Sequence, residues 1–191
     1  MDSSSTIANS NSEELVGKWL VSENHKNSFS KDESKLFFGL KPYPILQDTT
    51  LLDEEIVKVE VWSYEDERLH TQQKIEKEND LEKSFTTVYH INDQKIVIIG
   101  NSEIPETTIG NEGYSNFHLG MNNQPYLKSI SWDGFPIKHD VYLINDRSGK
   151  SELVAKKINA TPRLSPGAKY VYWYDQKDSA WFAFSFNSKI T

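Results

Sequence analysis

Residues 29–39 read FSKDESKLFFG, and residues 163–175 read RLSPGAKYVYWYD. Each stretch runs from a serine through a few turn-forming residues and a lysine into a strand rich in aromatic residues, and each precedes another strand–turn–strand. A recurring unit of this kind is typical of β-propeller blades, each with four antiparallel strands and about 40–50 residues. Because one blade cannot bury both of its faces alone, blades stack face to face around an axis.

Short β-branched and aromatic runs, separated by turn clusters, fill most of the remaining chain. The strongest turn cluster is NDRSGK at residues 145–150. The sequence predicts an all-β fold, in the form of a partial β-propeller of about three four-stranded antiparallel blades. The predicted strands are 16–22, 35–39, 57–62, 84–91, 95–99, 117–120, 140–144, 151–156, 163–165, 169–174 and 180–186.

A charged insertion interrupts this pattern near residues 66–83. It is rich in Gln, Glu and Lys and contains neither Gly nor Pro, which favours a helix. Its apolar members Leu69, Ile75 and Leu81 do not form a broad stripe, so we expect the helix to be mostly solvated. A charge run of this kind is usually a solvated face, and a functional alternative is that it contacts another domain or subunit.

The domain organisation follows from these units. We expect residues 1–14 to be a disordered leader, because they are small and polar. Residues 15–191 are expected to form an incomplete propeller, with blades at about 15–100, 101–158 and 160–191. Three blades cannot close a ring, since known propellers have at least about four. We therefore expect the chain to be a truncated part of a longer protein.

Composition excludes several classes of function. The 191 residues carry a net charge of -7, which disfavours nucleic-acid binding, because that needs positive charge against phosphate. With 0 cysteines the chain has no disulfide scaffold, no thiolate zinc site, no iron–sulfur cluster and no cysteine nucleophile. No apolar run reaches the about 18 residues of a membrane span.

At five places the sequence resembles one known family, and two of them are the predicted strands at 88–91 and 140–144. Ser165-Pro166-Gly167-Ala168-Lys169-Tyr170 corresponds to that family's Ser-Pro-Asp-Gly-Lys-Tyr blade turn, and residues 30–36, SKDESKL, match a Ser-x-Asp-Gly-type turn. VEVWSYEDERLHTQQ at 59–73 resembles a stretch of a divergent bacterial branch. Over about residues 25–191, the chain is similar to the N-terminal β-propeller of prolyl oligopeptidase-family serine peptidases, which include dipeptidyl peptidase IV.

The resemblance implies a role without chemistry of its own. The propeller would cap the active site of an α/β-hydrolase domain, absent here, filter peptide substrates by size and help to hold the peptide N-terminus. The parent reaction would be peptide-bond hydrolysis through Ser, His and Asp residues outside this chain. The start of the chain lacks the features of a signal peptide, so the compartment stays open between cytoplasm, periplasm and secretion in a bacterium.

Glu33 and Ala168 depart from the family pattern, because both stand where the family usually has Gly. If the turn is retained, both residues adopt a positive φ at a cost of about 1 kcal/mol each. The other alternative is that the turn type has changed.

The candidates for chemistry in this sequence are weak, and we assign no catalytic, cofactor-binding or metal-ligating residue. Residues 113–117, GYSNF, are the nearest match to a Gly-x-Ser-x-Gly nucleophile elbow, but Phe117 replaces the last glycine. The acidic pairs Glu54-Glu55 and Asp66-Glu67 lie in polar turns. No two histidines have the spacing of a metal site on one helix or strand, and they are expected to be exposed or at interfaces; they are His25, His70, His90, His118 and His139.

Two alternatives to the peptidase interpretation remain. One is a stand-alone propeller-like binding or scaffold module of the TolB type, in which the aromatic residues of 170–186 serve as a stacking platform rather than a core between blades. The other is a lipocalin-like carrier of small ligands, suggested by Gly17-Lys18-Trp19 and by a length that suits an eight-stranded barrel. The charged insertion and the repeated turn do not fit the barrel.

Overall fold

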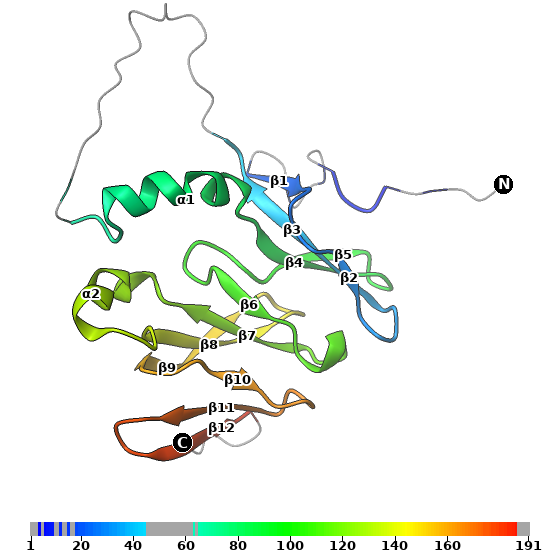
Figure 1. Ribbon diagram of the computed structural model, residues 1–191. Coiled ribbons are helices and arrows are strands. Elements are labelled where there is room, and N and C mark those ends of the chain that lie inside the picture. The colour runs from blue at the N-terminus through cyan, green and yellow to red at the C-terminus, as the bar shows by residue number, and fades with distance from the viewer. Residues whose placement is uncertain are drawn as a thin grey trace, which may run out of the picture.

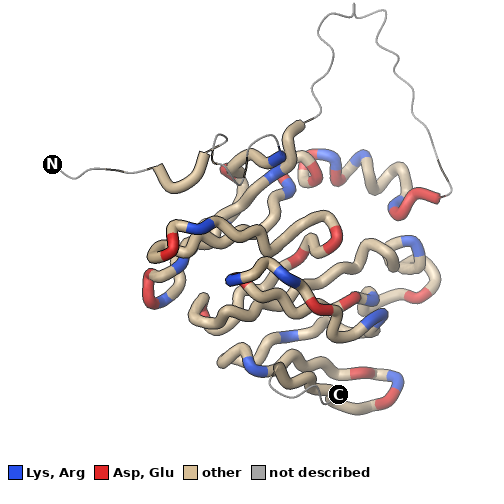
Figure 2. The backbone as a smooth tube through the Cα atoms, turned by 180° about the vertical axis from the view of Figure 1, so that it is seen from behind, with Lys and Arg blue, Asp and Glu red and all other residues tan. Residues whose placement is uncertain are grey.

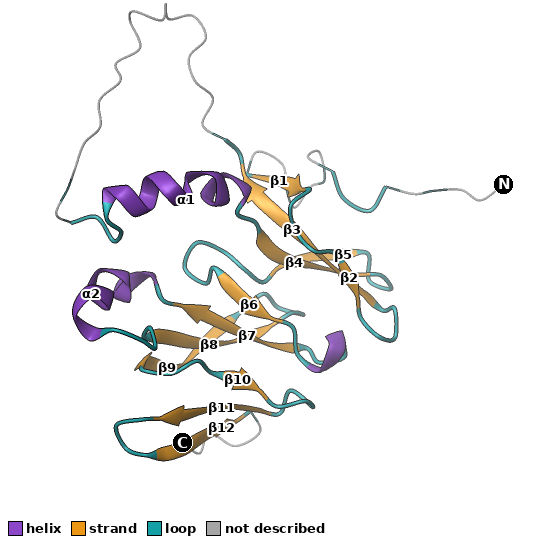
Figure 3. Cartoon of the chain, viewed as in Figure 1, coloured by secondary structure: helices purple, strands orange, loops and turns teal. Residues whose placement is uncertain are grey.

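In the computed structural model the chain is mostly β, and its strands form three antiparallel sheets (Figure 1, Figure 3). The structure describes residues 18–44 and 65–186, together with residues 4, 6–9, 12, 15 and 63. The described strands form no closed barrel, so the lipocalin-like architecture is not observed. The predicted strand at 57–62 lies outside the described residues.

Sheet A is the first sheet along the chain. Its strands are β1 (Trp19–Ser22), β2 (Ser28–Phe29), β3 (Lys35–Pro42), β4 (Phe85–His90) and β5 (Lys95–Ile98). Both β1 and β2 pair with the same side of β3, and β4 and β5 follow in order, all antiparallel. Pro42 is the last residue of β3, as expected for a residue without a backbone N–H.

Sheet B is an antiparallel meander of four strands. It consists of β6 (Glu106–Thr108), β7 (Phe117–Asn122), β8 (His139–Asn145) and β9 (Ser151–Ile158), paired in chain order. A bulge near Val141 shifts the register between β8 and β9. Short helices occupy two of its connections: η1 (Asn111–Gly113) before β7, and η2 (Gln124–Ser129) with α2 (Ile130–Asp133) before β8.

Sheet C has three described strands, again in chain order. They are β10 (Arg163–Leu164), β11 (Tyr170–Asp175) and β12 (Ala180–Ser185). One face of β11, with Val171 and Trp173, packs against sheet B. The opposite face of the β11–β12 hairpin carries Tyr170 and Tyr174 of β11 and Trp181 of β12, which are all exposed.

The charged insertion forms helix α1 (His70–Glu82), which has no buried residue. The amide of Leu69 is capped by the Gln72 side chain at 3.2 Å. Arg68 bridges Glu76 and Asp80, one helical turn apart, at 2.5 and 2.6 Å. The helix is therefore held by surface ion pairs rather than by a core, as the sequence predicts. Among the described residues, no helix has the length and apolar character needed to cross a membrane.

Two apolar clusters lie between successive sheets. Between sheets A and B, Phe37, Val88 and Ile99 meet Ile104 and Ile144. Between sheets B and C the cluster consists of Leu119, Val141, Ile158, Ala160, Val171 and Trp173. On the far side of sheet A, Leu15 covers Phe38, Leu40 and Ile96 and is fully buried. Because adjacent residues of a strand face opposite sides, Phe37 and Phe38 serve different clusters.

The connections between strands lie at two opposite ends of the sheets. The segments that contain α1, η2 with α2, and the β11–β12 hairpin tip lie on the left in Figure 1. The turns β2–β3, β8–β9 and β10–β11, with η1, lie on the right. We call these ends the excursion end and the tight-turn end.

The two stretches with the shared sequence pattern fold into the same turn. The Ser30 amide donates to the Lys35 carbonyl and the Ser165 amide to the Tyr170 carbonyl, both at 2.9 Å. The Ser30 hydroxyl accepts the Lys35 amide at 2.9 Å, and the Ser165 hydroxyl accepts the Tyr170 amide at 3.1 Å. Lys35 is thus the counterpart of Tyr170, so the lysines that the sequence comparison set side by side, Lys35 and Lys169, are not equivalent.

Glu33 and Ala168 hold the left-handed position of this turn. Their φ angles are 57° and 48°. Their amides donate to the Ser30 and Ser165 carbonyls at 2.9 and 2.8 Å. The turn type is therefore unchanged, and non-glycine residues occupy the left-handed position, which is the first of the two alternatives given above.

Candidate functional site

A cluster of buried polar side chains joins sheets A and B at the tight-turn end. Lys35 begins β3, His90 ends β4, His118 lies in β7 and Asp146 follows β8. All four are buried, and Asp146 and His118 have no exposed surface. Ionisable side chains are rarely buried this deeply unless they are paired, so the cluster is the first candidate for a functional centre.

Asp146 is the acceptor at the centre of this cluster. Its Oδ2 accepts a hydrogen bond from Lys35 Nζ at 2.7 Å and another from His118 Nε2 at 3.0 Å. Lys35 Nζ also donates to the Ser115 carbonyl at 2.9 Å and to Asn116 Oδ1 at 3.0 Å. All three N–H donors of the Lys35 ammonium group, which belongs to sheet A, therefore bind acceptors in sheet B and its loops.

The hydrogen bonds determine the tautomer of His118. Its Nδ1 accepts the Gly110 amide at 3.1 Å, so this nitrogen carries no hydrogen. Nε2 then carries the hydrogen and donates it to Asp146. The Phe37 ring packs edge-on against the imidazole, with centroids 5.5 Å apart. Both nitrogens of His118 are in use.

His90 approaches the same aspartate from β4. Its Nε2 donates to the Asp146 backbone carbonyl at 2.9 Å. The second carboxylate oxygen of Asp146, Oδ1, is buried and has no hydrogen-bond partner among the described residues. It lies 3.9 Å from His90 Nε2. Burial raises the pKa of the Asp146 carboxyl, but hydrogen bonds from His118 and Lys35 outweigh it, and the pKa lies below its ordinary value.

The geometry of the cluster supports a tie between sheets rather than catalysis. Ser115, the serine of the weak nucleophile-elbow match, lies in the loop before β7, and its hydroxyl accepts the Phe117 amide at 2.9 Å. His118 has no ring nitrogen left to take a proton from that hydroxyl. In the described part of the chain, no group of three or more metal-ligating side chains forms.

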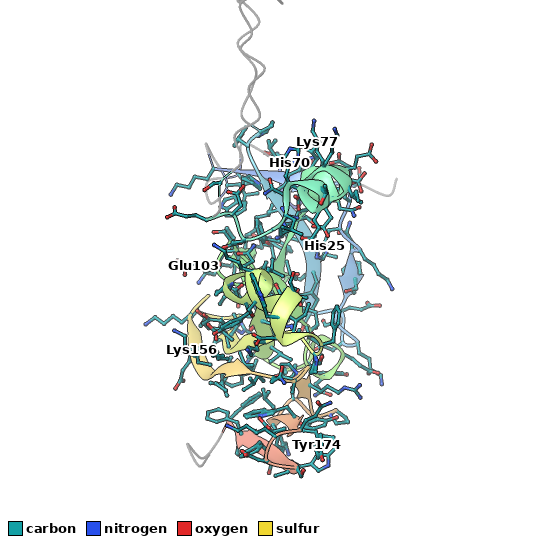
Figure 4. All side chains as sticks on the ribbon, turned by 60° about the vertical axis from the view of Figure 1, so that its left-hand side comes forward. His25, His70, Lys77, Glu103, Lys156 and Tyr174 are labelled. Carbon is teal, nitrogen blue, oxygen red and sulfur yellow. The ribbon has the colours of Figure 1, made fainter. Side chains whose placement is uncertain are left out.

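The other histidines do not converge on this cluster. His70 begins α1, and His139 begins β8 at the excursion end. His25 Nε2 is hydrogen-bonded to the Thr86 hydroxyl at 3.2 Å, and burial lowers its pKa. Figure 4 places His25 and His70 near α1 and Tyr174 at the opposite end of the stack.

The acidic pairs also stay apart from the cluster. Glu54-Glu55 lies outside the described residues, and Asp66-Glu67 is exposed just before α1. Figure 2 shows the positions of Lys and Arg interspersed with those of Asp and Glu along the backbone.

Two cavities at the excursion end lie between the α1 region and the η2–α2 segment. One, of about 510 Å³, is lined in part by Leu69, Leu127, Ile130 and Trp132. The other, of about 380 Å³, is more polar and includes Glu76, Asp80, Glu106, Asn123 and Gln124. The charged insertion thus forms one wall of a groove, although no residue of α1 is buried.

The aromatic residues of sheet C divide between two surfaces. Trp173 and Phe182 stack on the face toward sheet B, with centroids 5.8 Å apart. On the other face, the ring of Trp181 packs against the rings of Tyr172 and Tyr174, with centroid distances of 6.0 and 5.4 Å. A cavity of about 280 Å³ beside Trp181 is also lined by Arg163, Asn159 and Gln176.

Sequence reasoning missed the Lys35–His118–Asp146 connection because the three residues come from separate hairpins. The only local signals were a lysine at the start of an apolar strand and a histidine within one. Comparison with known proteins adds no relative: no family model matches the chain, and no curated protein matches it.

Proposed function

We propose that the chain is a non-catalytic β-propeller segment of a serine peptidase of the prolyl oligopeptidase type. In that role it caps the active site of an α/β-hydrolase domain and filters peptide substrates by size. The observation that carries the proposal is the order of the sheets: three antiparallel sheets follow one another along the chain, each packed on the one before.

The repeated turn supports a propeller over an irregular β fold. The turns at Ser30 and Ser165 lead into β3 of sheet A and β11 of sheet C and share their hydrogen bonds. Both keep a left-handed φ although neither has glycine there, at about 1 kcal/mol each. A turn kept at that cost in two units suits repeats of one architecture.

The exposed face of sheet C supports a propeller in which a further sheet stacks on sheet C. Lys35 and Phe37 of β3 face sheet B and are buried. Their counterparts in β11, by the shared turn, are Tyr170 and Tyr172 on the exposed face. Large exposed aromatic surfaces mark interaction sites, and another sheet stacked here would give this face the burial that β3 has.

The chemistry of the described residues supports a cap rather than an enzyme. Both ring nitrogens of His118 are in use, and Asp146, which His118 binds, is the acceptor for Lys35 from sheet A. The groove between α1 and the η2–α2 segment supports contact with a further domain at the excursion end. A hydrolase domain seated there would be contacted by the charged insertion.

A stand-alone binding module is the second candidate, and the cavity beside Trp181 favours it. Trp181 is 70% exposed and is flanked by Arg163, Asn159 and Gln176. Exposed tryptophan with planar polar neighbours is a common platform for stacked ligands. If this surface is itself the functional site, no further sheet covers it.

The reading frame around the coding sequence separates the two candidates. The peptidase proposal expects the frame to continue past Thr191 through further strand–turn repeats to a Gly-x-Ser-x-Gly segment. A stop codon directly after Thr191 would favour the binding module. The 191-residue chain alone should not react with a fluorophosphonate probe for active serines, and stoichiometric labelling would contradict a non-catalytic role.

A further inference from the structure

Two well-exposed apolar side chains meet in the groove at the excursion end. Trp132 of α2 is 80% exposed, and Leu69, the residue before α1, is 63% exposed. Both line the cavity of about 510 Å³, together with the half-buried Leu127 and Ile130. Single exposed apolar residues are ordinary, but four apolar residues from two separate segments on one groove indicate a binding surface.

The groove also has the position and size of a ligand site. Its walls are the start of α1, from the β3–β4 connection of sheet A, and the η2–α2 segment, from the β7–β8 connection of sheet B. In Figure 1 these two segments lie one above the other at the excursion end. The volume lies within the range of about 300–1,000 Å³ that is typical of pockets for small ligands, so the groove accommodates a large side chain.

The charges around the groove favour a cationic ligand. The two cavities there are lined by five carboxylates and three lysine or arginine side chains, with His70 beside them: Asp66, Glu67, Glu76, Asp80 and Glu106 against Arg68, Lys83 and Lys128. The guanidinium of Arg68 is already paired with Glu76 and Asp80. Glu67 lines both cavities, is exposed and has no hydrogen bond or ion pair to another described residue. A positive group on a ligand would therefore meet an unpaired carboxylate beside the apolar wall.

We propose that this groove binds a peptide segment in which a large apolar side chain is followed by Lys or Arg. The apolar side chain packs against Trp132 and Leu69, and the cationic side chain pairs with Glu67. That the occupant is a peptide rests on the proposed function, whereas its apolar and cationic chemistry rests on the groove alone. The cap then selects peptides by their side chains as well as by their size.

Peptides with blocked ends test the groove, because no terminal charge can replace the side chain. The probe is the peptide Gly-Gly-Phe-Lys-Gly-Gly with an N-terminal acetyl group and a C-terminal amide. In an NMR chemical-shift titration it should bind saturably with a Kd of about 1 mM or tighter and shift the indole resonance of Trp132. Replacing its Phe by Ala should weaken binding about tenfold, and replacing its Lys by Glu about fivefold. Absence of saturable binding, or equal affinity for the three peptides, would overturn the proposal.

Matched variants of the chain locate the binding. Trp132→Ala should lower the affinity for the probe about tenfold, whereas Trp181→Ala, which removes a similarly exposed ring outside the groove, should leave it unchanged. Glu67→Gln should remove most of the preference for Lys over Glu in the peptide. Glu78→Gln should keep that preference, because Glu78 belongs to α1 but lines neither cavity. Equal effects within either pair of variants contradict the site.

Two further outcomes separate this proposal from the proposed function. If the 191-residue chain binds the probe as described and the reading frame stops after Thr191, the groove is supported and the peptidase proposal fails. The second experiment uses the protein of the complete reading frame, with any active serine blocked by a fluorophosphonate. If this protein does not bind the probe that the shorter chain binds, a further domain covers the groove, and its assignment to a peptide is overturned.

Discussion

Lys35 Nζ and Asp146 Oδ2 lie 2.7 Å apart, although 111 positions separate the two residues in the chain. The contact joins the start of a strand in sheet A to the end of a strand in sheet B, and both side chains are almost wholly buried. A buried ion pair makes the relative position of the two sheets specific, because any slip leaves a charge without its partner.

Removal of Lys35 alone should be strongly destabilising. Lys35→Met leaves Asp146 buried with a single donor, His118, and we expect a loss of about 3–5 kcal/mol in the free energy of unfolding. Urea denaturation measures this loss. Lys41→Met is the matched control, because Lys41 pairs with exposed Glu23 and should lose at most about 1 kcal/mol. Equal losses in the two variants would contradict the role of the buried pair.

The same pair gives a pH dependence of stability. The pKa of the Asp146 carboxyl is below its ordinary value, so the folded state binds this proton less readily than the unfolded state. Its stabilisation is complete above the unfolded pKa of about 3.9 and is lost as pH falls through the lower folded pKa. In urea unfolding between about pH 5 and 2, the wild type should therefore lose unfolding free energy that Asp146→Asn does not lose. Identical pH profiles of the unfolding free energy in the wild type and in Asp146→Asn would refute the stabilising role of the Asp146 carboxylate.

Restoring glycine to the repeated turn should stabilise the protein. Glu33 has φ of 57°, and Glu33→Gly removes the left-handed strain, with an expected gain of about 1 kcal/mol. Ser34→Gly, next to it in the same turn but without a positive φ, should give no gain. Thermal unfolding of the two variants checks this, and a lower melting temperature for Glu33→Gly would show that the turn is not strained.

Gly113 should tolerate alanine much less than Gly134, although both have positive φ, 88° and 70°. A Cβ at Gly113 would lie 2.7 Å from Ser30 Cβ and 2.9 Å from the Phe37 ring, whereas one at Gly134 meets nothing within 4 Å. We expect Gly134→Ala to cost about 1–3 kcal/mol for its backbone strain alone, and Gly113→Ala to cost roughly a further 1–3 kcal/mol for the clash. Similar losses would mean that loop 109–116 is not packed on sheet A.

The sequence predicts the features that depend only on residues close together in the chain. The turns at Ser30 and Ser165 could be recognised because their hydrogen bonds join residues at most five positions apart. The solvated helix in 66–83 could be predicted because its composition alone favours it. The η2–α2 segment was missed, since one short turn of helix carries no periodic signal.

The candidate site could not be predicted, because its contacts are not local. His118 lies in β7 and Asp146 follows β8, and only the stacking of sheet B on sheet A brings Lys35 to them. The histidine spacings that the sequence was searched for describe a single helix or strand. A centre assembled from three hairpins leaves no such spacing.

The most direct test of the propeller proposal is a crystal structure of the protein encoded by the complete reading frame that contains this chain. The proposal expects at least one further four-stranded sheet on the face of β11 and β12, with Tyr172 and Trp181 buried beneath it, and a hydrolase domain beyond the ring. A structure in which that face stays open to solvent and no sheet follows β12 would contradict it.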